Sequence, residues 1–247
     1  MTTSAEPQKK QSWIYSLLKQ AYYLYGGSPT RRTIFNFKYL ATYRLYADLR
    51  EVLGARSGSV LDFGCGTKPY KSWFLNTNRY VGVDMYEDPH VDVVVKGGDI
   101  PIGDKEGDFD YVLATQVFEH TETLHYLKDL YRLLKPGGEI IITMPFIYHV
   151  HEERDFRRLT TQGAKQMLQD YGFETVEIRK QGGIGSTLTV ERLYFVDALF
   201  RHHTSRIGKL LLSPVILVWY LLVAPLMNVW GLFLDLCDPT GRFYNHI

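Results

Sequence analysis

The sequence has little cysteine, almost no excess charge and no apolar leader. Two cysteines occur in 247 residues, Cys65 and Cys237, which excludes a disulfide framework and a cysteine-based zinc knuckle. The 28 lysine and arginine residues nearly balance the 27 aspartate and glutamate residues, so we expect no nucleic-acid partner. Residues 1–11 are polar and lack the apolar core of a signal peptide. We therefore expect a cytoplasmic protein in a reducing environment.

The most informative segment runs from Ser59 to Asp84 and reads SVLDFGCGTKPYKSWFLNTNRYVGVD. Its two short apolar runs, at either end of the segment, predict two buried parallel strands of a βαβ unit. The glycines that follow the first run allow a sharp turn in which the backbone approaches a ligand. Asp84 closes the second run, where a carboxylate can accept hydrogen bonds from the two hydroxyls of a ribose. The segment therefore predicts one half of a nucleoside-binding fold.

Further strands and helices alternate along the chain. We expect strands at Val91–Val95, Phe109–Ala114, Glu139–Met144 and Phe173–Arg179, and helices that begin near Thr121 or Thr123 and near Thr160 or Thr161, the second ending at Tyr171-Gly172. This succession indicates an α/β fold with a doubly wound, mostly parallel sheet. Two tyrosine-rich helices, Trp13–Tyr25 and Thr33–Leu53, are expected to cover the core, with one or two tyrosines either in that layer or over a ligand site.

The glycine turn does not fit a dinucleotide. That fold requires a third glycine at the start of the following helix, and Pro69 occupies this position after Gly64 and Gly66. Asp62, two residues before Gly64, would repel a pyrophosphate but suits a ligand with a cationic end, such as the amino group of an amino acid. A nicotinamide-dependent reductase is therefore the weaker alternative.

Six short motifs occur in order and resemble those of class I S-adenosylmethionine (SAM)-dependent methyltransferases, especially the type 11 group. They are Asp62-Phe63-Gly64-Cys65-Gly66, Val83-Asp84, Gly98-Asp99-Ile100, Phe109-Asp110-Tyr111-Val112, Phe118-Glu119-His120 and Leu134-Lys135-Pro136-Gly137-Gly138. The resemblance covers residues 57–179. It implies a seven-stranded Rossmann-like sheet in residues 57–181, with an N-terminal helical cap in 1–56. An apolar helical block and a last antiparallel strand, Gly241–Ile247, would fill residues 182–247.

The resemblance also implies roles for single residues in binding SAM. Gly64 and Gly66 would pass close to its methionine part, and Asp62 would lie near its amino group. Asp84 would hold the ribose hydroxyls. The remaining implied contacts are Met85 and Ile100 against the adenine, Asp99 at the adenine amino group, and Thr115 and Gln116 beside the sulfonium. Taken singly, Asp84 could instead cap a strand and Asp99 could form a turn. Lys68 stands where many relatives carry glycine.

Three residues on loops after the strands are the candidates for catalysis. Methyl transfer to a hydroxyl requires a base, and a histidine oriented by a carboxylate suits neutral pH. We name His120, His151 and Asp155. His120 could instead help to shape the cofactor pocket, and Asp155 could simply pair with Arg158. Residues 149–152 also have the spacing of a metal site, but without a third firm ligand we expect no metal.

The segment Leu210–Leu234 carries no charged residue and is preceded by a basic stretch, Arg201–Lys209. Its length could span a bilayer, but Pro214 and Pro225 are expected to begin separate shorter helices. Three arrangements stay open for residues 207–236, namely attachment to a membrane surface, a homodimer interface or an extra helical layer on the sheet. A single transmembrane span is the least favoured. Peripheral attachment would place the protein at the inner face of the membrane.

Taken together, the motifs predict a SAM-dependent methyltransferase that acts on a hydroxyl of a small molecule, a glycan or a lipid-linked saccharide. The segment from Asp155 to Thr160 resembles a pattern in bacterial methyltransferases of glycan and cell-envelope pathways. A SAM-binding scaffold without catalytic activity is the alternative from a different class.

Overall fold

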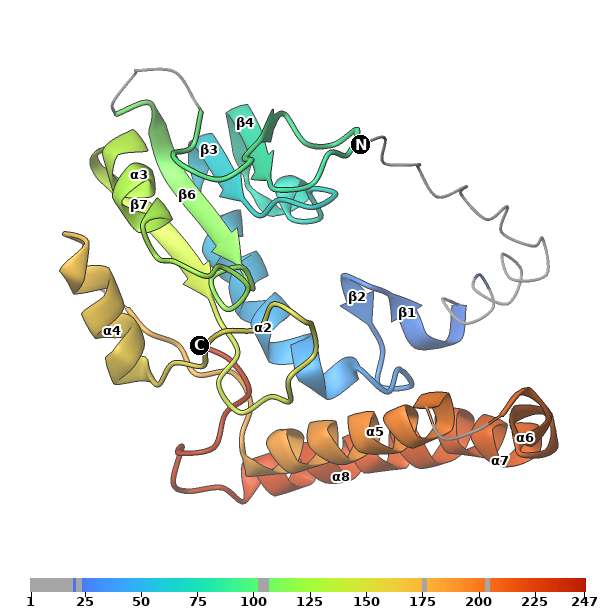
Figure 1. Cartoon of the computed structure of the whole chain (residues 1–247). Coiled ribbons are helices and arrows are strands. Elements are labelled where there is room, and N and C mark those ends of the chain that lie inside the picture. Colours follow the sequence, from blue (N-terminus) through green and yellow to red (C-terminus); the bar gives the residue numbers. More distant parts are fainter. Residues whose placement is uncertain (1–19, 21–23, 102–106, 175–176, 203–204) are drawn as a thin grey trace, which may run out of the picture.

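The computed structural model describes residues 20, 24–101, 107–174, 177–202 and 205–247. The elements of the core, in chain order, are β1 (Gly27–Ser28), β2 (Arg31–Arg32), α2 (Tyr39–Gly54), β3 (Ser57–Phe63), η1 (Lys71–Trp73), β4 (Asn76–Asp84), β5 (Val93–Val94), β6 (Phe109–Thr115), α3 (Tyr126–Leu133), β7 (Leu134–Thr143) and α4 (Thr161–Asp170). The C-terminal elements are α5 (Ile184–His202), α6 (Arg206–Leu211), α7 (Ser213–Val218), η2 (Trp219–Val223) and α8 (Ala224–Leu236). Figure 1 shows the sheet separated by α2 from the long pair α5 and α8.

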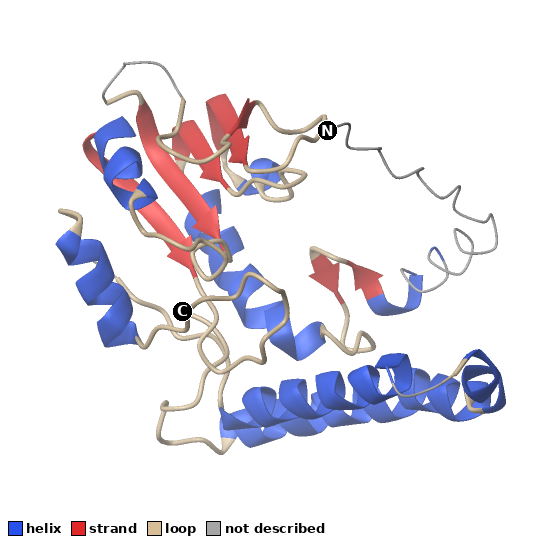
Figure 2. Ribbon diagram, viewed as in Figure 1, coloured by secondary structure: helices blue, strands red, loops and turns tan. Residues whose placement is uncertain are grey.

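A parallel sheet with the order β5-β4-β3-β6-β7 forms the centre of the molecule, and Figure 2 shows these strands in red among the helices. Successive residues of a strand face opposite sides of a sheet, so the core divides into two clusters. Leu61 packs with α3 and α4 on one face, whereas Val60 packs with α2 on the other. Both side chains are fully buried. Helices therefore cover both faces, as the alternating sequence predicts.

Local sequence explains where several helices begin and end. Thr160 caps α4, because its side chain accepts a hydrogen bond from the Gly163 backbone N–H at 3.1 Å. The expected helix Thr33–Leu53 begins later, at Tyr39. The expected helix Trp13–Tyr25 falls almost wholly outside the described residues.

The sheet has five strands over the described residues, so the expectation of seven is wrong for this part of the chain. The described part of Phe173–Arg179 forms no strand, because it buries no continuous apolar face and Ile178 is exposed. Instead of a strand, Gly241–Ile247 contributes two isolated antiparallel bridges from His246, to Pro145 and to Gln181. The terminal segment thus runs antiparallel beside the end of β7, as expected, but without strand length.

The C-terminal helices continue through both prolines. Pro214 and Pro225 lie in the first turns of α7 and α8, and the Leu221 carbonyl, four residues before Pro225, accepts a hydrogen bond from the Tyr25 hydroxyl. The π-helical turn η2 joins α7 to α8, and its flanking residues keep right-handed helical angles. Each proline thus lies in the first turn of a helix, as predicted, but α7, η2 and α8 follow one another without a gap. By length and composition alone, the continuous helix Ser213–Leu236, with a mean hydropathy of 2.0, could cross a membrane.

Candidate functional site

A glycine turn connects β3 to the rest of the site. The Gly64 and Cys65 backbone N–H groups both donate to the Val83 carbonyl, at 2.8 and 3.0 Å. The Gly66 N–H donates to the Asp84 carboxylate at 2.9 Å. Gly64 has a φ of +73°, and a Cβ there would lie 2.3 Å from a Val117 methyl group. Glycine is thus required both by backbone angle and by space.

Asp62 is a buried carboxyl group at the end of β3. Its side chain accepts a hydrogen bond from the Tyr80 hydroxyl at 2.6 Å and forms no ion pair among the described residues. Burial raises its pKa from 3.8 to about 7, and the Tyr80 hydrogen bond offsets part of this rise. Opposite Asp62 in the register lies Gly82, which has no side chain to compete for the space. A cationic group that approached Asp62 would stabilise its ionised form.

Lys68 adopts the left-handed backbone angle that glycine favours, with a φ of +55°. Here the Lys68 ammonium lies 2.5 Å from an Asp92 carboxylate oxygen, which also accepts from the Gly82 N–H at 2.7 Å. The ion pair connects the glycine turn to the loop between β4 and β5.

The other residues expected at the adenosine end occupy different environments. Met85 and Asp99 are exposed, with no structural element that encloses them. Ile100 is buried in the core, and its N–H donates to the Asp129 carboxylate at 3.1 Å. Their contacts with adenine stay predictions.

Thr115 and Gln116 lie at the end of β6, next to the turn. The Thr115 hydroxyl is buried and has no hydrogen-bond partner among the described residues. Gln116 has a φ of +55°, which is strained for a residue with a side chain, and its N–H donates to the Thr143 carbonyl at 2.9 Å. Strain and an unpaired hydroxyl at a strand end are typical of ligand-binding positions.

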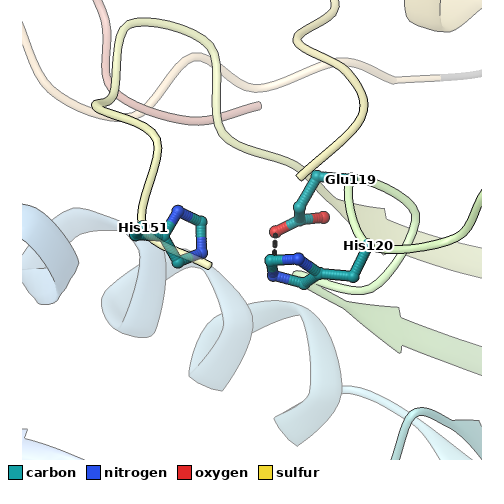
Figure 3. Close-up of side chains that lie close together, drawn as sticks. All are labelled: Glu119, His120 and His151. Carbon is teal, nitrogen blue, oxygen red and sulfur yellow. Dashed lines mark ion pairs between the residues drawn. The ribbon is translucent and has the colours of Figure 1, made fainter. Parts of the chain in front are cut away.

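The two histidines expected in catalysis, His120 and His151, lie close together beyond the end of β6. Figure 3 shows His151 facing His120 and Glu119, and the two imidazole rings lie edge to face with their centres 5.0 Å apart. The loop with His151 is attached to the loop after β6, because the Phe156 N–H donates to the Glu119 carbonyl at 2.7 Å. The cluster therefore lies at the same edge of the sheet as Asp62 and the glycine turn.

Hydrogen bonds determine which ring nitrogen of each histidine carries the proton. His151 Nδ1 lies 3.3 Å from the Asp155 carboxylate and 3.4 Å from the His149 carbonyl, and both groups can only accept. His120 Nδ1 lies 2.6 Å from the Arg154 carbonyl, which also can only accept. In each neutral ring Nδ1 is thus the donor, and Nε2 keeps a free lone pair.

Asp155 is held in its ionised form. Its side chain is 1% exposed, and Arg158 forms two contacts with its carboxylate, one of them at 2.7 Å. The hydrogen bonds from Arg158 lower the pKa of Asp155 to about 2. Burial lowers the pKa of His151 despite the attraction of Asp155, so this imidazole is neutral at pH 7. The predicted histidine–carboxylate pair is present, and Arg158 holds the carboxylate of Asp155.

Glu119 is the residue that sequence reasoning left without a catalytic or binding role. Its side chain is fully buried, and neither carboxylate oxygen has a hydrogen-bond partner among the described residues. The nearest ring nitrogen is His120 Nε2, at 3.8 Å, and burial raises the pKa of Glu119 to about 7. Glu119, His120 and His151 each offer a ligand atom within 4.8 Å of the others. The neighbouring pair Glu119-His120 was the available signal in the sequence.

His149 points elsewhere. Its Nδ1 lies 3.4 Å from the Glu191 carboxylate of α5, and its ring contacts Tyr194 of the same helix with 4.3 Å between centres. His149 is therefore directed towards α5 and the loop 149–155 is attached to the C-terminal helices.

Comparisons with known proteins agree with this arrangement. A family described as "Methyltransferase domain" matches residues 37–178, which is more than half of the chain. No curated protein matches the chain by sequence.

Several solved structures are similar to the chain at low identity. One is a 1,6-didemethyltoxoflavin-N1-methyltransferase from Burkholderia thailandensis, with 19% identity, 72% of this chain and 86% of that chain covered, and a TM-score of 0.44. Another is phosphoethanolamine N-methyltransferase 2 from Haemonchus contortus, with 18% identity, coverage of 96% and 59%, and a TM-score of 0.44. A third is the [4+2]-cyclase SpnF, with 15% identity, coverage of 81% and 78%, and a TM-score of 0.48.

Proposed function

Because the chain belongs to the family of SAM-dependent methyltransferase domains, we propose that it methylates a hydroxyl group of a small molecule, a glycan or a lipid-linked saccharide. SAM is the cofactor, and when bound it supplies an electrophilic methyl group on a sulfonium. Such a transfer neutralises charge, so the protein contributes mainly alignment of the reactants and, for a hydroxyl acceptor, removal of a proton.

The residues around the glycine turn fit SAM. Asp62 is a buried carboxyl group with a raised pKa and no ion-pair partner among the described residues, which suits the cationic amino group of the methionine part. A Cβ built on Gly66 would meet nothing within 4 Å, so the backbone there is open to a ligand. Asp84 already accepts the Gly66 N–H through one oxygen and would hold the ribose hydroxyls. The unpaired Thr115 hydroxyl would border the reacting methyl group.

His151 is the base in this proposal. The His149 carbonyl accepts the Nδ1 proton, and the Asp155 carboxylate lies 3.3 Å from the same nitrogen, which leaves Nε2 free to take the proton of the acceptor hydroxyl. The lowered pKa of His151 keeps the ring neutral at pH 7, and the ionised Asp155 stabilises the imidazolium that forms. His120 lies edge to face against His151, and Glu119 lies beside His120, so these two residues border the space next to the His151 ring.

The observation that supports a hydroxyl acceptor is the pair His151–Asp155 at the carboxyl edge of the sheet, because a neutral amine acceptor would need no base. The test measures transfer of labelled methyl from SAM over a panel of hydroxyl and amine acceptors, together with calorimetric binding of SAM. We expect transfer to a hydroxyl that falls at least about a hundredfold in His151→Ala, with SAM affinity retained. Transfer only to amines, at equal rates in both proteins, would refute the assigned acceptor.

Asp84→Ala separates the cofactor site from the base. This variant should bind SAM at least about tenfold more weakly, because the ribose hydroxyls lose their charged acceptor. If SAM binds and no acceptor of the panel is methylated by the wild type, the chain is a SAM-binding scaffold towards those acceptors, and the proposed activity on them fails.

A further inference from the structure

We propose that the helical hairpin of α5 and α8 docks in the plane of an anionic membrane surface, with the outer face of α7, η2 and α8 in the lipid. We call this face the outer stripe. Its side chains are apolar and between 41% and 81% exposed, and they comprise Leu211, Leu212, Val215, Val218, Leu222, Leu226, Val229, Trp230, Phe233 and Leu236. In Figure 1, α8 lies on the side of α5 that faces away from the sheet. A continuous apolar surface of this length is unusual on a soluble monomer.

The interior of the hairpin combines apolar side chains, such as Leu193 of α5 and Ala224 of α8, with small and polar ones. The buried side of α8 contains Asn228 and Gly231, and the facing side of α5 contains the buried residues Ser186 and Thr189. A Cβ on Gly231 would lie 2.8 Å from the Thr189 hydroxyl, so the two helices approach closely through small residues. Close approach of two helices through small and polar residues is typical of packing in lipid, and here it occurs beside an apolar cluster.

Several polar donors inside the hairpin bond to the protein itself. The Asn228 amide donates to the carbonyls of Ile34 and Asn36, at 2.7 and 2.9 Å. The Tyr220 hydroxyl donates to the Asp197 carboxylate. The Asn228 amide oxygen and the Trp219 indole N–H are buried in the same region and have no hydrogen-bond partner among the described residues, so only part of the hairpin's polar groups is paired.

Charge distinguishes the membrane from a second copy of the chain. Between Ala198 and Leu234 the sequence contains no acidic residue, while Arg201 belongs to the last turn of α5 and Arg206 and Lys209 belong to α6. A pair of copies that met through the outer stripe would gain nothing from this positive charge, whereas anionic headgroups complement it.

Charge also distinguishes an in-plane hairpin from a spanning one. If the hairpin spanned the bilayer, the basic residues at the end of α5 and in α6 would have to cross the hydrocarbon. Arg192, which is exposed on α5, would then lie inside the hydrocarbon. Both steps are costly. Lying flat leaves these groups at the headgroups and buries only the outer stripe. Glu191 and Tyr194 of α5 contact the loop 148–155, so docking brings the neighbourhood of His151 to the membrane surface.

The test is flotation of the full chain with preformed vesicles of phosphatidylcholine, with and without about one third phosphatidylglycerol. We expect binding that is at least about tenfold stronger to the anionic vesicles and weaker at high salt. Leu226→Glu/Phe233→Glu places two charges in the outer stripe at sites that are more than half exposed, so the fold tolerates them. This variant should lose vesicle binding at least about tenfold.

Leu75→Glu is the matched control, because Leu75 is 73% exposed and lies between η1 and β4, away from the hairpin. It should bind vesicles like the wild type. Sedimentation of all three proteins without lipid tests the alternative occupant of the outer stripe, which is a second copy of the chain. Equal flotation of the wild type and the double variant would overturn the proposal. A tight wild-type dimer that does not bind vesicles, and that the double substitution disrupts, would also overturn it. Circular dichroism confirms that each variant is folded.

Depth of insertion tests the in-plane orientation. Tryptophan fluorescence should be quenched more by bromine placed near the headgroup end of the acyl chains than by bromine near their ends, and Trp230→Phe should reduce this quenching. Stronger quenching from the bilayer centre would refute the flat orientation.

Discussion

The buried carboxyl group of Asp62 should destabilise the cofactor-free protein at neutral pH. Burial raises its pKa from 3.8 to about 7, so between these values the folded protein holds a proton that the unfolded chain has released. The free energy of unfolding therefore falls as pH rises through this window. A shift of about three pKa units corresponds to about 4 kcal/mol, with the loss complete above about pH 7. Asp62→Asn removes this titration and should stabilise the cofactor-free protein by up to that amount.

Urea unfolding without SAM, at pH values from about 5 to 8, measures this effect. The difference between Asp62→Asn and the wild type should widen by about 1.4 kcal/mol for each pH unit and level off near pH 7. Glu119 titrates in both proteins, so its contribution cancels. Tyr80→Phe provides a second check, since loss of its hydrogen bond raises the pKa of Asp62 further and moves the plateau to higher pH. Parallel stability curves for wild type and Asp62→Asn would refute the reasoning.

The same variant should bind SAM poorly although it is more stable. The wild type is expected to bind SAM more tightly as pH rises through about 7, because the amino group of SAM pairs with the ionised carboxylate. Asp62→Asn should show weak binding that does not change over this range. An unchanged affinity in calorimetry would contradict the role of Asp62 as a counter-ion.

Three further predictions concern the turn and the histidine cluster. Gly64→Ala should lower the free energy of unfolding by about 2 to 5 kcal/mol, from its positive φ and the clash with Val117, and Val117→Ala in that background should restore part of the loss in urea titrations. The rate of methyl transfer should decrease only when the pH drops below the ordinary histidine pKa, because burial lowers the pKa of His151. Asp155→Asn should reduce the rate while SAM binding is kept. Stability of the wild type should also fall from about pH 4.5 to 7 through Glu119, whose raised pKa disfavours the ionised state, and a Glu119→Gln variant with an unchanged profile would contradict this.

The loop 149–158 shows how far local patterns extend. The spacing of Asp155 and Arg158 predicted their pairing, and the structure confirms it. The sequence also predicted a histidine beside a carboxylate, and the fold of the loop brings His151 Nδ1 to 3.3 Å from Asp155. At His149 the spacing alone did not indicate the orientation of the side chain, because α5 draws it towards Glu191.

The sequence by itself determined the parallel arrangement and the glycine turn. In a parallel sheet the carboxyl ends of neighbouring strands share one edge, so residues that follow those strands must meet there, as Asp84 and Gly66 do. Only the tertiary structure decided what depends on contacts between distant segments. It placed Glu119 beside His151, ended the sheet at five strands over the described residues, and turned the apolar side of α8 outward. Local periodicity specifies which residues share a face, but the neighbours of that face depend on the packing of the whole chain.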